Sequence, residues 1–322
     1  MTTARSITHP PAGLQPLVPP HPAFDGGPVY LDYNATTPID PRVAEAMRPA
    51  LAEAFGNPSS AHAYGPPARA GLDRARAQVA ALLGAGEPTV AGNDGRIVFT
   101  SSGSEADALA IRGSVPAALD ADPARWAGHR PQVITQATEH PAVLAACRYL
   151  QRWHDAEVTV LDVDGDGQLD PADLATALTD RTVLVTVMHA NNETGTVQPI
   201  AALSRITHQA GALFHTDAAQ TAGKIPLDVA DLDVDLPTLV GHKMYAPKGI
   251  AALYVRAGIQ LERRLAELPA GVDVVAYCRG AYCVLAYDAV RLLTSHGWSA
   301  RRLREGMLEW RLAGMPVQSG AA

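Results

Sequence analysis

The stretch RIVFTSSGSEADALAI, residues 96–111, joins an apolar run to a Ser-Ser-Gly-Ser turn and then to a segment with helical spacing. The apolar run predicts a strand, and the small polar residues after it predict the start of a helix. The first turn of a helix offers free backbone N–H groups and the positive end of the helix dipole, so this junction suits a phosphate. A strand followed by an ordinary N-capped helix is the alternative interpretation.

Strand-like and helix-like segments alternate along most of the chain. Further strands are predicted at residues 132–136, 157–163, 182–190 and 212–218, and helices at residues 67–84 and 199–211. This alternation predicts an α/β fold with a mostly parallel sheet flanked by helices, and ligands beyond the carboxyl ends of the strands. Residues 1–28 are rich in proline, which removes hydrogen-bond donors, so we expect a disordered arm there.

The composition favours small-molecule chemistry. The 322 residues carry a formal net charge of −7, and a chain without a basic excess does not suit nucleic acid or an anionic membrane. No apolar run approaches the roughly 20 residues that cross a bilayer, and no signal-peptide core is visible, so we expect a cytoplasmic protein. The three cysteines, Cys147, Cys278 and Cys283, are an odd number and favour free thiols over a disulfide framework.

Polar side chains follow several predicted strands, and one lysine lies in a predicted loop. These residues are His140 in TEH, Asn192 in HANNETG, Asp217 in FHTDAAQ and Lys243 in VGHKMYAPKG. Taken singly, Asp217 fits a helix cap, His140 a structural residue and Lys243 a surface charge. Taken together with the phosphate-type turn, they supply every contact that a lysine-bound pyridoxal 5′-phosphate (PLP) needs. The set therefore predicts PLP binding, with Lys243 as the point of attachment.

Seven segments, in this order, carry a resemblance to a known family: VYLDYNATTPIDPRV, FGNPSSAHAYG, FTSSGSEADALAI, TEHPAVL, ANNETGTVQPI, HTDAAQTAGKIPLDV and GHKMYAPKGIAALYVR. Over residues 29–262 the chain resembles the cysteine desulfurases of the class V aminotransferase fold. The resemblance implies the large domain of a fold-type I PLP-dependent transferase that mobilises sulfur from L-cysteine or a related amino acid. It also implies a homodimer, a sulfur-acceptor protein and a role in iron–sulfur cluster assembly.

Carried over position by position, the resemblance implies a role for each site residue. Lys243 binds the cofactor covalently and acts as the base, His140 stacks on the ring, and Asp217 pairs with the ring nitrogen. The other implied contacts are Asn192 and Gln220 near the phenolic oxygen, and Gly103, Ser104 and His242 at the phosphate. One departure is Val240, which stands where the family usually has a serine that donates to the phosphate.

After residue 262 the family pattern is no longer recognisable, including its arginine for the substrate carboxylate and its mobile cysteine loop. Residues 263–318 instead resemble the C-terminal half of a rhodanese sulfurtransferase domain, through VVAYCRGAYCVLAYDAVRLL and LREGMLEWRLAGMPV; residues 319–322 form a tail. This resemblance implies that Cys278 is a nucleophilic loop thiol and that Cys283 resolves a persulfide. Alternatively, both cysteines are small apolar residues of a core.

Three functions are consistent with these features. The first is a PLP-dependent desulfurase impaired by the missing segments, the second a rhodanese-like persulfide sulfurtransferase that uses Cys278, and the third a non-catalytic protein that keeps the fold. The acidic turn DVDGDGQLDPAD, residues 162–173, imitates an EF-hand calcium loop. It follows a strand instead of a helix, so no metal site is predicted there.

Overall fold

The computed structural model describes residues 21–86, 95–261, 274–276, 290, 293–294 and 299–302. The chain divides into two compact units, one formed by Met1–Pro49 and Arg76–Leu261 and the other by Ala50–Ala75 and Glu262–Ala322. The large sheet and the candidate site described below belong entirely to the first unit.

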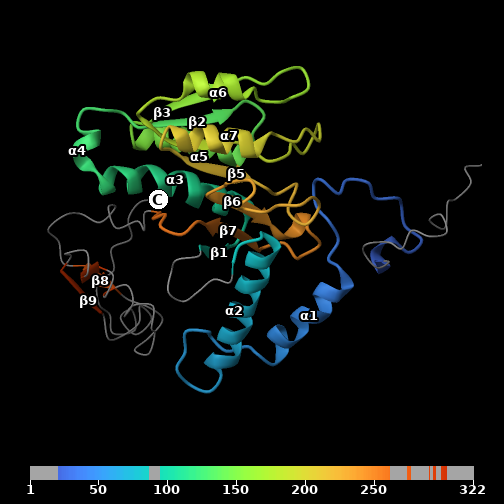
Figure 1. Cartoon of the computed structure of the whole chain (residues 1–322). Helices are drawn as coiled ribbons and strands as arrows, with labels where there is room; N and C mark the ends of the chain where they lie inside the picture. The colour runs from blue at the N-terminus through green and yellow to red at the C-terminus, as the bar shows by residue number, and fades with distance from the viewer. Residues whose placement is uncertain are drawn as a thin grey trace, which may run out of the picture. The chain divides into compact units, whose positions relative to one another are not determined.

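A seven-stranded sheet with the order β1-β7-β6-β5-β4-β2-β3 organises the first unit (Figure 1). Its strands are β1 (Arg96–Thr100), β2 (Gln132–Gln136), β3 (Glu157–Leu161), β4 (Thr182–Thr186), β5 (Leu213–Asp217), β6 (Leu236–Val240) and β7 (Ala251–Val255). β7 is antiparallel to both of its neighbours, and every other pair is parallel. The mostly parallel sheet predicted from the sequence is therefore confirmed, and β1 to β6 all end at the same edge.

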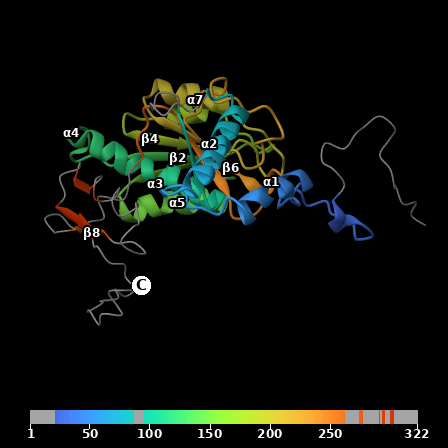
Figure 2. The same cartoon turned by 90° about the horizontal axis from the view of Figure 1, so that it is seen from below.

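Helices cover both faces of this sheet, and Figure 2 shows α3 and α5 on one side with α7 on the other. The helices of the described residues are α1 (Pro41–Ala52), α2 (Gly65–Leu82), α3 (Gly103–Ala121), α4 (Pro123–Trp126), α5 (Pro141–Trp153), α6 (Pro171–Ala177) and α7 (Ile200–Gln209), of which α1 and α2 continue into the second unit. Val133 packs into the apolar cluster of α3 and α5, whereas its neighbour Ile134 packs into the cluster of α6 and α7. The side chains of successive strand residues thus point to opposite faces of the sheet, as in any pleated strand.

Two predicted strands extend further than those observed. The segments 157–163 and 182–190 are predicted as strands, but β3 ends at Leu161 and β4 at Thr186. Beyond β4, the Met188 N–H donates to Oε1 of Glu139 at 2.6 Å instead of to a neighbouring strand. The N–H groups of Val187 and His189 still donate to His215 and Asp217 of β5, so the Glu139 side chain replaces a strand acceptor only at Met188.

Some elements are not predicted from the sequence at all. β6 contains Pro237, which lies opposite Thr216 of β5, and proline is a poor signal for a central strand. β7 was also missed. Within the arm expected to be disordered, Pro22–Phe24 forms one 3₁₀ turn (η1), because proline at the first helical position has no N–H to leave unsatisfied.

The described part of the second unit includes two short strands that pair with each other. β8 (Val274–Ala276) is parallel to β9 (Ala300–Arg302). Leu293 and Thr294, between them in the sequence, are helical. Among the helices of the described ranges, none combines the length and the apolar character of a membrane-spanning segment.

Candidate active site

Polar segments follow the strands at the edge of the sheet where β1 to β6 end. β1 leads into the start of α3, β2 is followed by His140, β5 ends in Asp217, and β6 leads into a 3₁₀ turn, η2 (Gly241–Lys243). Because these strands point the same way, their polar ends meet around a cavity of about 740 Å³. The cavity lies where a ligand of a parallel α/β sheet is expected.

Most of the predicted cofactor residues line this cavity: Gly103, Ser104, His140, Asn192, Asp217, His242 and Lys243. Gln220 does not line it. Its Nε2 donates to the backbone oxygen of Asn34 at 2.9 Å, and its Oε1 accepts from Lys224 at 3.1 Å. Asn34 itself lines the cavity, so Gln220 contacts the site through the backbone of Asn34. The predicted thiol, Cys278, lies outside the described residues.

The loop that carries Lys243 follows the buried strand β6 directly. Gly241 opens this loop, and a Cβ on it would lie 2.8 Å from Cγ2 and 2.9 Å from the backbone oxygen of Ile250. The N–H groups of Met244 and Ala246 both donate to the Gly241 carbonyl, which closes the turn. Within the described part of the chain, Lys243 forms no hydrogen bond or ion pair, so its amine is free to react in the cavity.

The first turn of α3 forms another wall of the cavity. The hydroxyl of Ser102 caps the helix by accepting from the Glu105 N–H at 3.2 Å. Gly103 and Ser104 line the cavity within this turn, where backbone N–H groups have no acceptors inside the helix. A Cβ on Gly103 would lie 2.5 Å from Cγ2 of Val240, so only glycine lets the helix start approach β6 this closely. The wall suits an anion such as a phosphate.

Asp217 is a buried carboxyl group of the cavity, with only 6% of its surface exposed. Its Oδ1 accepts from the Ala219 N–H at 2.9 Å. Burial raises the pKa of Asp217, while the Ala219 N–H and the positive charges of His140 and Lys243 act to lower it. A buried carboxylate needs a positive partner, and a protonated pyridine nitrogen is one.

Two other buried acids close to this site are not predicted from the sequence. Asp107 of α3 lines the cavity, and its Oδ1 lies 3.6 Å from Nε2 of His215. Burial, followed by the charge of Asp217, raises the pKa of Asp107 well above its usual range. Burial also raises the pKa of Glu139 to about 8 and lowers the pKa of His215 to about 3. Glu139 and His215 are therefore mainly uncharged at neutral pH, and burial favours the protonated form of Asp107.

The segment before α1 also contributes to the cavity without having been predicted as part of the site. It supplies Leu31, Asp32, Asn34 and Ala35. Nδ2 of Asn34 donates to the backbone oxygen of Asn192 at 3.0 Å, which joins this segment to the end of the sheet. The motif VYLDYNATTPIDPRV contains these residues. A motif this far from Lys243 in the sequence does not show, however, which residues it contacts in the fold.

The acidic turn of residues 162–173 lies between β3 and α6. Oδ1 of Asp164 accepts from the N–H groups of Asp166 and Gln168 at 2.9 and 2.8 Å, so the carboxylate serves the turn itself. Across the part of the chain that the structure describes, no group of three or more His, Cys, Asp or Glu side chains is arranged to hold a metal ion.

Comparison with known proteins places these residues in a family. The family model for class V aminotransferases matches residues 29–279. The cysteine desulfurase IscS of Anaeromyxobacter sp. (strain Fw109-5) is 47% identical over 245 residues, which cover 76% of this chain and 56% of that protein. A cysteine desulfurase of Cereibacter sphaeroides is 43% identical over 293 residues, covering 87% of this chain and 70% of the relative.

Solved structures give the same result. A NifS-like protein is similar with a TM-score of 0.65 and 35% identity, covering 73% of this chain and 60% of the other. A structure described as SspA in complex with cysteine has a TM-score of 0.63 and 38% identity, covering 70% of this chain and 60% of the other. The chain spans a little over half the length of several of the curated relatives it matches.

Proposed function

Because this chain belongs to the class V aminotransferase family, we propose that it mobilises sulfur from L-cysteine with PLP as its cofactor. PLP is the cofactor that class V aminotransferases and cysteine desulfurases use. The observation that carries the proposal is the unpaired Lys243, which lines one cavity together with Asp217 and His140. The relatives named cysteine desulfurases support the reaction type. The related structure that contains cysteine supports the substrate class.

The chemistry of the cavity fits PLP. An aldehyde needs an amine, which Lys243 supplies; a phosphate needs N–H donors, which the first turn of α3 supplies; a pyridinium needs a buried carboxylate, which Asp217 supplies. His242 adds a ring nitrogen at the same place. Val240 offers no donor where the family pattern has a serine, and a hydrogen bond to a charged group contributes about 1.5–3 kcal/mol. We therefore expect binding that is weaker than in relatives with the serine.

Each residue has a distinct task in the proposed reaction. When bound, PLP draws electrons from the α-carbon of the amino acid and makes its proton acidic. Lys243 would hold the cofactor covalently until the amino group of the substrate takes its place, and the released Nζ would then accept the proton from the α-carbon. Asp217 keeps a negative charge at the ring nitrogen, and His140 covers one face of the ring.

The acceptor of the sulfur must be a thiolate. Within the described residues the only cysteine is Cys147, which lies in α5. Burial raises the pKa of the Cys147 thiol to about 12, so it is a thiol in the core and not a nucleophile. Of the remaining cysteines, we propose Cys278 as the acceptor, with the rhodanese-like loop still a prediction from the sequence.

Trapping the bound cofactor tests the assignment of Lys243. We expect borohydride reduction of the protein incubated with PLP, followed by peptide mapping, to find a pyridoxyl group on Lys243. The variant Lys248→Ala is the control, because it removes an exposed lysine of the same loop and should keep the label. Label on other lysines, or none on the wild type, contradicts the proposal.

We further propose a homodimer and a sulfur-acceptor protein as partners, both from the resemblance to cysteine desulfurases. The family's cross-subunit segment after residue 262 is not recognisable, so we expect weak association. Light scattering should then give a mass that rises with protein concentration. A constant monomer mass at high concentration contradicts the dimer.

A further inference from the structure

The segment Thr36–Asp40 lies along the loop that carries Lys243, although about 200 residues separate them in sequence. The Thr37 N–H donates to the backbone oxygen of His242 at 2.8 Å, and the Asp40 N–H donates to that of Tyr245 at 3.0 Å. These two bonds flank Lys243 on both sides. Two backbone hydrogen bonds thus hold the segment against the loop on either side of Lys243.

The hydroxyl of Thr37 makes two hydrogen bonds to this loop. It donates to the backbone oxygen of His242 at 3.0 Å and accepts from the Tyr245 N–H at 2.9 Å. Thr37 is 7% exposed, so little water reaches these groups. One side chain therefore bridges the residue before Lys243 and the residue two positions after it.

The loop needs this support because of its backbone conformation. Tyr245 has φ of 63°, in the left-handed region that bulky residues rarely adopt. Such a conformation persists only where surrounding contacts hold it. Both hydrogen-bonding groups of the Tyr245 backbone are taken by the segment: Thr37 accepts from its N–H, and Asp40 donates to its carbonyl.

We propose that Thr37 is a positioning residue for Lys243: its hydroxyl fixes the loop so that the amine of Lys243 faces bound PLP. The proposal rests on the proposed function, because it concerns the same lysine. Thr37 does not line the cavity, so it acts only through the backbone of the loop. The neighbouring Thr36 also contacts His242: its Oγ1 lies 3.1 Å from Nδ1 of the ring and 3.4 Å from the backbone oxygen, but it does not reach Tyr245.

Three variants separate the hydroxyl from the shape of the side chain. Thr37→Val keeps the shape and loses both hydrogen bonds, whereas Thr37→Ser keeps the hydroxyl. Thr207→Val is the matched control, because Thr207 is fully buried in α7 and its hydroxyl donates to Leu203 within the same helix. None of these changes removes a charge.

The readout is the rate at which PLP attaches to Lys243 at saturating PLP, followed by visible absorbance and by borohydride trapping. We expect Thr37→Val to slow attachment about tenfold, as the loss of one to two hydrogen bonds implies, and Thr37→Ser and Thr207→Val to stay within about twofold of wild type. A variant that is only less stable keeps the wild-type rate while folded. Attachment by Thr37→Val at the wild-type rate, or equal slowing by Thr37→Ser, overturns the proposal.

Amide hydrogen exchange gives a second measurement that does not depend on Thr37→Val folding. The Tyr245 amide should be protected in the wild type and in Thr37→Ser, because Thr37 Oγ1 is its acceptor. Exchange at the rate of a solvated amide overturns the proposal. A wild type that never labels Lys243 overturns the proposed function and the positioning role with it, whereas a labelled wild type matched by Thr37→Val overturns only the positioning role.

Discussion

Asp107 and Asp217 are buried acids of the same cavity, but their burial is compensated differently. Asp217 accepts a backbone hydrogen bond from Ala219, and the charges of His140 and Lys243 favour its ionised form. Oδ1 of Asp107 has no hydrogen-bond partner among the described residues. Burial, followed by the charge of Asp217, raises the pKa of Asp107 well above its usual range, and a hydrogen bond with Thr238 and the charge of Lys243 offset this only in part.

This difference predicts that Asp107→Asn stabilises the protein at neutral pH. The pKa of Asp107 in the folded chain is above its ordinary value of 3.8, so between the unfolded and the folded pKa the folded state keeps a proton that the unfolded state releases. Stability is therefore lost as pH rises above about 4, and asparagine, which does not titrate, avoids this loss. Urea unfolding should show Asp107→Asn equal to wild type near pH 4 and more stable near pH 7. A variant less stable than wild type at pH 7 would show that Asp107 is ionised.

The same reasoning predicts the opposite result for Asp217→Asn in cofactor binding. Asparagine is neutral and removes the negative charge that a pyridinium requires, so PLP affinity should fall by about tenfold or more. Asp107→Asn is the matched control in the same cavity, with PLP affinity expected close to wild type. Equilibrium titration with PLP, followed by absorbance, measures both. Equal losses in the two variants would contradict the assignment of Asp217 as the partner of the ring nitrogen.

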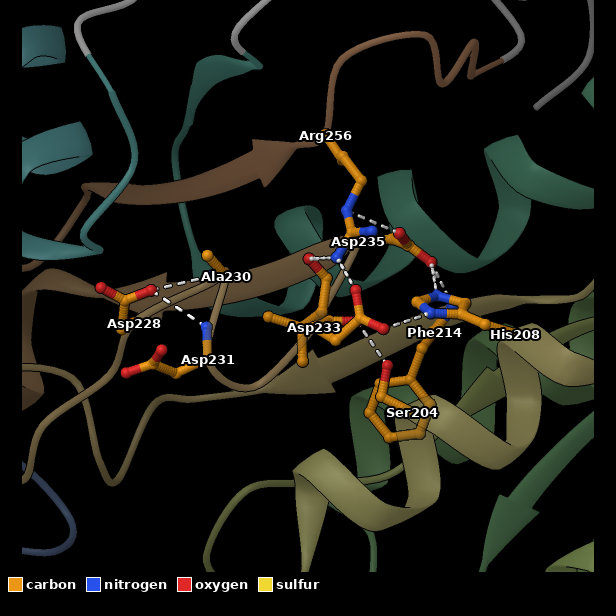
Figure 3. A network of polar contacts seen from close by, with 10 residues as sticks. Ser204, His208, Phe214, Asp228, Ala230, Asp231, Asp233, Asp235 and Arg256 are labelled. Carbon is orange, nitrogen blue, oxygen red and sulfur yellow. Dashed lines mark hydrogen bonds and ion pairs between the residues drawn. The ribbon is translucent and has the colours of Figure 1, made fainter.

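At the scale of elements, a network of ionised side chains joins α7 to the sheet (Figure 3). His208 of α7 contacts Oδ2 of Asp233 through Nδ1 at 2.9 Å and Oδ2 of Asp235 through Nε2 at 2.8 Å. Arg256, which follows β7, reaches the other oxygens of the same two carboxylates at 2.8 and 3.0 Å. The Phe214 N–H at β5 also donates to Asp235. The network therefore ties α7, β5, β6 and β7 together.

The network predicts a stability that depends on the protonation of His208. Burial acts to lower the pKa of His208, but the hydrogen bonds and charges of Asp235 and Asp233 outweigh it and raise the pKa. A raised pKa stabilises the fold fully below the ordinary value of 6.5, and this contribution is lost as pH rises through the folded pKa. The melting temperature of the wild type should therefore exceed that of His208→Gln, and the difference should be largest below pH 6.5.

The control for this experiment is His129→Gln, which removes an exposed histidine that pairs with no carboxylate within the described residues. Its melting temperature should follow that of the wild type at every pH.

The pH dependence has the opposite sign for Asp233. Burial acts to raise the pKa of Asp233, but hydrogen bonds from Arg256 and His208 lower it below 3.8. The contribution of Asp233 is present above that value and is lost as pH falls through the folded pKa. A wild-type advantage over His208→Gln that grows with pH would contradict the network.

At the scale of the whole molecule, sequence patterns predict the parallel sheet and most of the cavity because both follow from local order along the chain. Strand ends such as Asp217 and His140 meet because parallel strands share an edge, which a strand pattern already implies. The contacts of Thr37 with His242 do not follow from any local pattern, because 205 residues separate them and only the folded chain brings them together. The protonation of Asp107 depends on burial, which a single helical position does not reveal.

The same limit applies to Pro237 and Gln220. Pro237 lies in a central strand where proline is rare, so its strand was not predicted from local preference. Gln220 was predicted as a cofactor contact from its motif, but its amide bonds to Asn34 and Lys224 instead of lining the cavity. Contacts with a distant partner, such as that of Gln220 with Asn34, are thus the ones that sequence patterns do not predict, and the contact of Gln220 with the cofactor stays a prediction.

The last prediction concerns turnover by the whole chain. From the sequence we expect the arginine that orients the substrate carboxylate and the loop cysteine of the family pattern to be missing after residue 262, and a misplacement of about 1 Å can slow a reaction on the order of a hundredfold. We therefore expect PLP to bind while sulfide release from L-cysteine stays far below ordinary enzyme rates, with the residual activity dependent on Cys278. Sulfide assays should show activity in the wild type and in Cys147→Ser, whose thiol is buried, and none in Cys278→Ser. Turnover at ordinary rates, or activity that survives Cys278→Ser, would show that another group accepts the sulfur.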